Sequence, residues 1–171
     1  MAPEWFVVNA RQTTWRRRPG RGYSAPLTGF TAEEERTLFP QLGMQIVVLD
    51  PGEPIGMYHW EKDAEGFVVL SGEALLLVEG EERPLRQWDF FHCPPGTRHM
   101  IVGAGDGPCV VVGAGSREHT DEDCNGGAYV VDEVAQRHGA GVDEETSDPA
   151  LAYARFPDPE LVDYPDGLLS D

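Results

Sequence analysis

The chain has 171 residues, of which 40% are hydrophobic and 25% are charged, and its formal net charge is −17. This length accommodates one domain with a substantial core, and the negative charge argues against nucleic acid and anionic membranes as partners. No run approaches the ~20 apolar residues that a membrane helix needs, and the N-terminus lacks the pattern of a secretory signal. We therefore expect a soluble cytoplasmic protein.

Residues 1–40 are expected to form an N-terminal arm and a strand that joins the rest of the domain. Residues 11–21 hold five of the 13 basic residues and no acid, whereas residues 118–171 hold 15 of the 30 acids. We expect the basic stretch to be a solvated or self-docking segment that meets this acidic tail, rather than a nucleic-acid site. Residues 31–36 have the N-cap and capping-box pattern of a single helical turn.

Residues 41–115 consist of short apolar runs separated by Gly, Pro and Asp turns. The runs span 44–49, 67–70, 74–78, 83–86, 90–91, 100–102 and 109–112. Runs of this length at intervals of about 8–12 residues are typical of an antiparallel sandwich or barrel. Because no helix-length periodic segment interrupts them, we predict an all-β core that includes Phe67, Val69, Leu75 and Leu77.

Residues 116–171 differ in composition, and we expect an acidic extension with short helices. Residues 132–138, followed by Gly139, have the pattern of a short helix with a glycine C-cap. Residues 147–155 combine an N-cap candidate with proline in the first turn. Residues 156–171 contain three prolines and five acids, which indicates an extended tail that lies over the barrel or frays.

Four side chains with metal-binding chemistry lie in two segments of the β-rich region. His59 and Glu61 are two residues apart, so on a strand their side chains leave the same face. Glu65 follows a polar stretch that can turn the chain, and His99 follows the Pro-Pro-Gly turn at 94–96. Imidazole and carboxylate groups on converging strands suit a divalent first-row transition metal.

The first segment resembles the first motif of the cupin superfamily. His59, Glu61, Glu65 and Gly72 form the pattern His-x-Glu-x3-Glu-x6-Gly. The family motif has a second histidine at the place of Glu61, and its leading glycine would correspond to Gly52, which is one residue too far away.

The second segment resembles the second cupin motif. Residues 94–99 read Pro-x-Gly-x2-His, and Asp89 stands in the usual position before them. Trp88 replaces the glycine of the family motif, and Gly103 replaces its asparagine. The two motifs occur in the family's order, and the resemblance covers residues 41–115.

The resemblance implies a cupin-type jelly-roll β-barrel that holds one divalent transition metal ion per chain, often in a homodimer. Family members bind iron, manganese, zinc, nickel or copper through three histidines and a glutamate. Carried over, His59, Glu65 and His99 keep their ligand types, and Glu61 is the departure. A fourth ligand with negative charge favours Mn²⁺ or Fe²⁺, while Zn²⁺ and Ni²⁺ remain compatible. Without Glu61, the other three form a two-His-one-carboxylate site with open positions.

The resemblance further implies a small metalloenzyme that acts on a small organic metabolite, and oxygenase, isomerase and lyase chemistry are all compatible. Glu61 or Glu65 is the candidate general base, although Glu61 can also be an exposed carboxylate beside Lys62. Arg98 is a candidate for holding a substrate carboxylate, and a surface ion pair is its alternative. The alternative function is a non-catalytic module that binds or senses a small metabolite.

Overall fold

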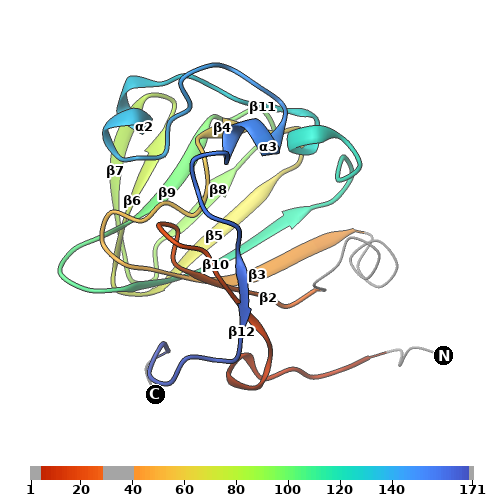
Figure 1. Cartoon of the computed structure of the whole chain (residues 1–171), viewed down its shortest axis with the longest axis vertical. Helices are drawn as coiled ribbons and strands as arrows, with labels where there is room; N and C mark the ends of the chain where they lie inside the picture. Colours follow the sequence, from red (N-terminus) through yellow and green to blue (C-terminus); the bar gives the residue numbers. More distant parts are fainter. Residues whose placement is uncertain (1–4, 29–40, 170–171) are drawn as a thin grey trace.

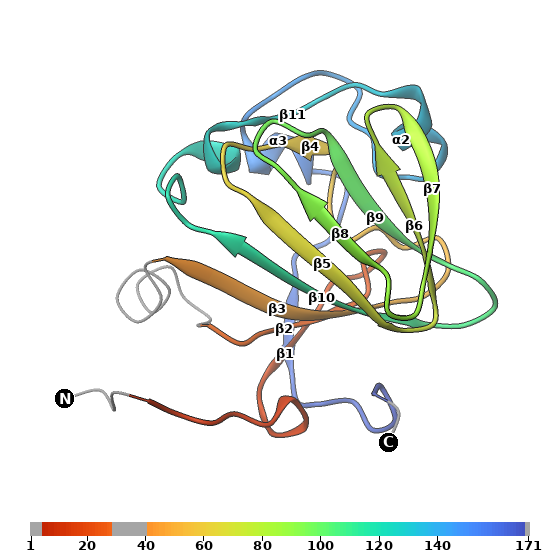
Figure 2. The same cartoon turned by 180° about the vertical axis from the view of Figure 1, so that it is seen from behind.

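The chain, described in a computed structural model over residues 5–28 and 41–169, forms two antiparallel β-sheets (Figures 1 and 2). Its strands are β1 (Trp15–Arg17), β2 (Tyr23–Pro26), β3 (Leu42–Leu49), β4 (His59–Trp60), β5 (Glu65–Ser71), β6 (Glu73–Val78), β7 (Glu81–Arg86), β8 (Phe90–Cys93), β9 (His99–Ala104), β10 (Cys109–Ser116), β11 (Ala128–Tyr129) and β12 (Glu160–Val162). The larger sheet has the order β12-β1-β2-β3-β10-β5-β8, and the smaller has the order β11-β4-β9-β6-β7. The predicted all-β jelly-roll architecture is confirmed. The helical turn expected at 31–36 lies outside the described residues.

The main core lies between the two sheets, because alternate residues of each strand point inward. The larger sheet contributes the buried side chains of Val47, Leu49, Val69 and Val111, and the smaller contributes those of Ala74, Leu76 and Ile101. Phe67 and Val69 belong to this core, as predicted. Gly72 joins β5 to β6 with φ +74°, and a Cβ there would lie 2.6 Å from the carbonyl oxygen of Pro108. Only glycine fits this turn without strain.

The outer face of the smaller sheet is covered by the C-terminal extension, so β6 is buried on both faces. Leu77 is buried in this second cluster with Tyr58 and Ala135, and Leu75 packs against it half-buried. Leu75 and Leu77 therefore pack on a different face from Phe67 and Val69. The four residues are not one stripe facing a single core.

Short helices in the extension cap one end of the barrel, at the top of Figures 1 and 2. They are η2 (Asp123–Gly126), α2 (Glu133–Arg137) and α3 (Pro149–Ala152), and a further 3₁₀ helix, η1, spans Ala10–Gln12 near the N-terminus. Asp132 caps α2 by accepting a hydrogen bond from the backbone of Ala135, and Asp148 caps α3 by accepting one from Ala150. Both predicted helices are confirmed at shorter length. None of the described helices is long and apolar enough to cross a membrane.

The basic arm is part of the larger sheet. β1 pairs with β2 and with β12 of the acidic tail, opposing Arg17 to Glu160. The Nη1 atom of Arg17 lies 3.7 Å from Oε2 of Glu160, so the expected meeting of the two charged segments is confirmed. Trp15 is completely buried and donates from Nε1 to the carbonyl of Ala10. This attachment brings the residues that follow β1 to the open side of the barrel.

Candidate metal centre

The two histidines are brought together by strand register. His59 on β4 pairs directly with His99 on β9, and their ring centroids are 5.1 Å apart. Nδ1 of His59 lies 2.8 Å from the carbonyl oxygen of Met57, and Nδ1 of His99 lies 3.1 Å from that of Thr97. Because a carbonyl can only accept, each Nδ1 carries a hydrogen, so each ring in its neutral form presents the lone pair of Nε2.

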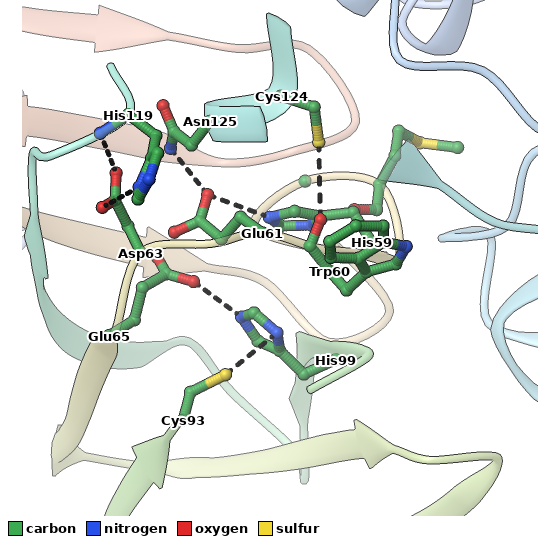
Figure 3. A network of polar contacts seen from close by, with 12 residues as sticks. His59, Trp60, Glu61, Asp63, Glu65, Cys93, His99, His119, Cys124 and Asn125 are labelled. Atoms are coloured by element: carbon green, nitrogen blue, oxygen red, sulfur yellow. Dashed lines mark hydrogen bonds and ion pairs between the residues drawn. The ribbon is translucent and has the colours of Figure 1, made fainter. Parts of the chain in front are cut away.

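Glu65 completes the group from the other sheet (Figure 3). It begins β5, and one ligand atom from each of His59, Glu65 and His99 lies within 4.8 Å of the others. Its Oε2 atom is 3.0 Å from Nε2 of His99, yet it accepts no hydrogen bond of regular geometry within residues 5–28 and 41–169. A buried carboxylate oxygen without such a partner is costly unless something else compensates it.

These three residues fit a divalent transition metal ion. Two imidazoles and one carboxylate are the ligand types of the two-His-one-carboxylate site. Histidine ligands usually donate their other N–H to a carbonyl or carboxylate, which fixes the tautomer and the ring orientation. Both His59 and His99 have that arrangement, and Glu65 offers an uncompensated oxygen.

Glu61 lies next to the group formed by His59, Glu65 and His99 but is not part of it. It follows β4, is only 6% exposed, and places Oε2 3.7 Å from Nε2 of His59. Nδ2 of Asn125 donates to the same oxygen at 2.6 Å. Burial raises the pKa of the Glu61 carboxyl, and the neighbouring His59 opposes this only in part. The alternative of an exposed carboxylate beside Lys62 is wrong, because Glu61 is buried, and Lys62 pairs with Glu122 instead.

Asn125 reaches Glu61 from a strained turn that the sequence pattern did not reveal. Cys124 and Asn125 both have left-handed backbones, with φ of 48° and 46°. Asparagine tolerates this conformation better than most residues, whereas cysteine does not. Gly127 permits the close approach, since a Cβ there would collide with the carbonyl of Trp60. The Asn-Gly-Gly sequence is the signal for a turn here, but it does not indicate the contact with Glu61.

Asp63 holds the loop between the ligands, and sequence reasoning also missed it. Its side chain is fully buried and accepts hydrogen bonds from the backbone N–H groups of Glu118 and His119 at 3.1 Å each. Nδ1 of His119 lies 3.0 Å from Oδ1 of Asp63, and the Ser116 hydroxyl donates to the same oxygen at 3.3 Å. Asp63 thereby fixes the chain between Glu61 and Glu65.

The charges at the centre favour an ion pair between Glu65 and His99. Burial alone would lower the pKa of His99, but the hydrogen bond and the charge of Glu65 raise it overall. Burial alone would raise the pKa of Glu65, and His99 lowers it overall. Cys93, whose Sγ atom is 3.2 Å from Nδ1 of His99, has its pKa raised to about 12, mainly by burial. Cys93 is therefore a neutral thiol near neutral pH.

A cavity of about 180 Å³ adjoins the centre, and His59, Glu65 and His99 are among its lining residues. Arg98 is not, because it points to the surface and pairs with Glu79 through Nη2 at 2.6 Å and Nε at 3.0 Å. The structure thus places Arg98 in the surface ion pair that the sequence left open. Two other arginines, Arg18 and Arg21, do line the cavity, and no sequence motif pointed to them.

A two-sheet barrel with a histidine-glutamate group inside it is the architecture of a cupin. The family model of the cupin domain matches residues 45–115, a range that includes all four ligand candidates. Residues 45–115 are therefore a cupin domain.

Solved structures support the same fold. KdgF from Halomonas sp. matches with a TM-score of 0.53 at 24% identity, over 68% of this chain and 96% of that one. A cupin-like protein from Thermotoga maritima matches with a TM-score of 0.53 at 18% identity, over 71% and 86%. A putative sugar phosphate isomerase from Acidithiobacillus ferrooxidans matches with a TM-score of 0.51 at 19% identity, over 85% of this chain and 78% of that one. A comparison with curated proteins gave no significant match.

Proposed function

We propose that this protein is a metal-dependent enzyme that acts on a small organic metabolite in the barrel cavity. The observation that carries the proposal is the group formed by His59, Glu65 and His99, whose ligand atoms lie within 4.8 Å of one another beside a cavity. Three protein ligands are fewer than a transition ion commonly takes, so the site leaves a position for substrate or water. An open position is typical of catalytic metal sites and not of structural ones.

The residues around the group have separate tasks in this proposal. His59, Glu65 and His99 would hold the ion, which when bound supplies Lewis-acid chemistry. Glu61 stays out of the group, and its raised pKa means that it takes up a proton more readily than an ordinary carboxylate, as a general base must. Asn125 holds the Glu61 carboxyl in place. Phe67 and Ile101 give the cavity an apolar wall that limits the entry of water.

A second candidate is a non-catalytic module that captures the same metabolite. One observation favours it: Cys93, the thiol beside His99, is kept protonated by burial and so cannot act as a nucleophile. In this candidate the metal would only help to bind the ligand, and Glu61 would have no proton to transfer.

The test compares wild-type protein with His99→Ala, using His92→Ala as the matched control because His92 is exposed on β8. Each protein is loaded with Mn²⁺ and incubated with a metabolite extract, and the mixture is followed by mass spectrometry. The proposal predicts that wild type and His92→Ala convert at least one metabolite and that His99→Ala converts none. Binding of a metabolite without conversion would contradict the enzyme and support the binding module.

A further inference from the structure

Arg18 is a buried cation with more than half of its hydrogen-bond donors unused among the described residues. It follows β1, is 9% exposed, and donates from Nη1 to the carbonyl of Ile55 at 3.1 Å. Its Nε and Nη2 atoms are buried and have no hydrogen-bond partner in the described part of the chain. These two nitrogens form the side-on fork of the guanidinium, the edge that donates two parallel N–H bonds to a carboxylate or a phosphate.

Arg21 stands next to Arg18 in the same cavity wall. Its guanidinium carbon lies 4.3 Å from the ring centroid of Tyr153 and 5.2 Å from that of Phe156. Its backbone N–H donates to the carbonyl of Arg18 at 2.8 Å, so a tight turn joins the two residues. Both rings contact the guanidinium, and Tyr153 also accepts a hydrogen bond from it. The Nε atom of Arg21 is likewise buried without a partner among the described residues.

This arrangement is unfavourable unless a ligand is present. Burial first, and the charge of Arg21 second, lower the pKa of Arg18 to about 10. Arg18 is therefore charged near neutral pH, and it is buried beside a second arginine. A buried charge whose donors lack partners is unfavourable. Groups of this kind persist mainly where function requires them.

We propose that Arg18 and Arg21 bind the anionic group of the substrate, a carboxylate or a phosphate, in the same cavity as the candidate metal ligands. This inference rests on the proposed function, because it names the substrate class for that site. Arg18, Arg21, His59, Glu65 and His99 all line one cavity of about 180 Å³. At about 30 Å³ per water, this volume equals about six water molecules, so the substrate is a small organic anion.

The first test measures anion binding by thermal unfolding of Mn²⁺-loaded protein. The probes are acetate, inorganic phosphate and the neutral acetamide, at ionic strength matched with chloride. At least one anion should raise the melting temperature of wild type, and acetamide should not. The anion that succeeds distinguishes carboxylate from phosphate recognition. Equal effects of acetamide and both anions on wild type would overturn the proposal.

The variant Arg18→Gln tests whether Arg18 binds the anion. We expect it to bind the successful anion at least about tenfold more weakly, because each lost charged hydrogen bond is worth a factor of that order. Arg83→Gln is the control, since Arg83 is 64% exposed and pairs with Glu81 on the surface. An Arg18→Gln response equal to that of wild type would overturn the proposal.

A second measurement separates a binding role of Arg18 from a structural one. In urea without anions, Arg18→Gln should be as stable as wild type or more stable, because an uncompensated buried charge has been removed. Glutamine can still donate to the carbonyl of Ile55. A clear loss of stability would mean that Arg18 serves the fold, and would contradict the proposal.

The failure of this inference can be told from the failure of the proposed function. Metal content is measured on every sample, and the anion titrations are repeated on metal-free protein. Arginine-dependent anion binding without any metal uptake would refute the metalloenzyme and leave the anion site standing. Full metal uptake, together with anion binding that does not depend on Arg18, would refute the anion site and leave the metal site standing.

Discussion

The cavity has two walls of different origin. One wall carries His59, Glu65 and His99, which come from strands of the cupin domain at residues 45–115. The other carries Arg18 and Arg21, which come from the N-terminal arm before that domain. The metal-binding wall follows a spacing that is visible in the sequence, whereas the arginine wall depends on β1 and β2 joining the sheet. Under the two proposals, the cupin domain supplies the metal ligands and its N-terminal attachment supplies the anion-binding arginines.

The largest expected effect is on the metal-binding wall itself. His99→Ala should weaken metal binding by more than about 100-fold, because removing a ligand costs more than the 10–100-fold typical of supporting residues. The hydrophobic core should stay intact, so the urea midpoint of the metal-free protein should change little. Calorimetric titration with Mn²⁺ measures the affinity, and His92→Ala is the control. Unfolding of His99→Ala would instead indicate a structural role for the residue.

The variant Asp63→Ala tests the residue that fixes the chain between Glu61 and Glu65. Asp63 accepts hydrogen bonds from Ser116, Glu118 and His119, so its removal leaves buried donors unpaired. We expect a loss of about 2–3 kcal/mol in the free energy of unfolding. Urea denaturation measures it, and Asp106→Ala, in an exposed turn, is the control. Equal stabilities of the two variants would contradict the role of Asp63.

The pH dependence of metal binding gives a further test of the same wall. Glu65 outweighs burial and raises the pKa of His99 above its ordinary value of about 6.5. A proton then competes with the metal for Nε2, since only neutral imidazole is a ligand. Below the raised pKa of His99, the apparent affinity for Mn²⁺ should fall by up to about tenfold per pH unit for each proton that the ion displaces. An affinity for Mn²⁺ that is the same at pH 6 and pH 8 would exclude His99 as a ligand.

Glu61 should give the smallest effect on metal binding. Because it lies outside the group of three and is held by Asn125, Glu61→Ala should weaken Mn²⁺ binding by less than about tenfold, below the 10–100-fold typical of supporting residues. Glu81→Ala, at an exposed surface ion pair, is the control. A loss as large as that of His99→Ala would make Glu61 a direct ligand.

The sequence predicted what depends on local spacing. Strand runs, helix caps and the convergence of His59, Glu65 and His99 follow from short-range patterns, and the structure contains them. Leu75 shows the first limit of prediction from the sequence. Its strand, β6, is buried on both faces, so the alternation of side chains does not tell which of the two hydrophobic clusters a residue joins.

Contacts between distant parts of the chain set the second limit. Asn125 reaches Glu61 across 64 positions of sequence, and Ser116 reaches Asp63 across 53. Arg18 enters the cavity only because Trp15 and β12 fix the arm to the sheet. No local pattern carries such information, because these contacts arise only after the strands have paired.

The most direct test of the central claim is the metal content of wild-type protein, purified without chelator and then supplied with Mn²⁺, Fe²⁺, Zn²⁺ or Ni²⁺. Elemental analysis should find about one equivalent of one of these ions per chain, and none in the triple variant His59→Ala, Glu65→Ala, His99→Ala. Less than about one-tenth of an equivalent in wild type, with no ion able to restore it, would contradict the account.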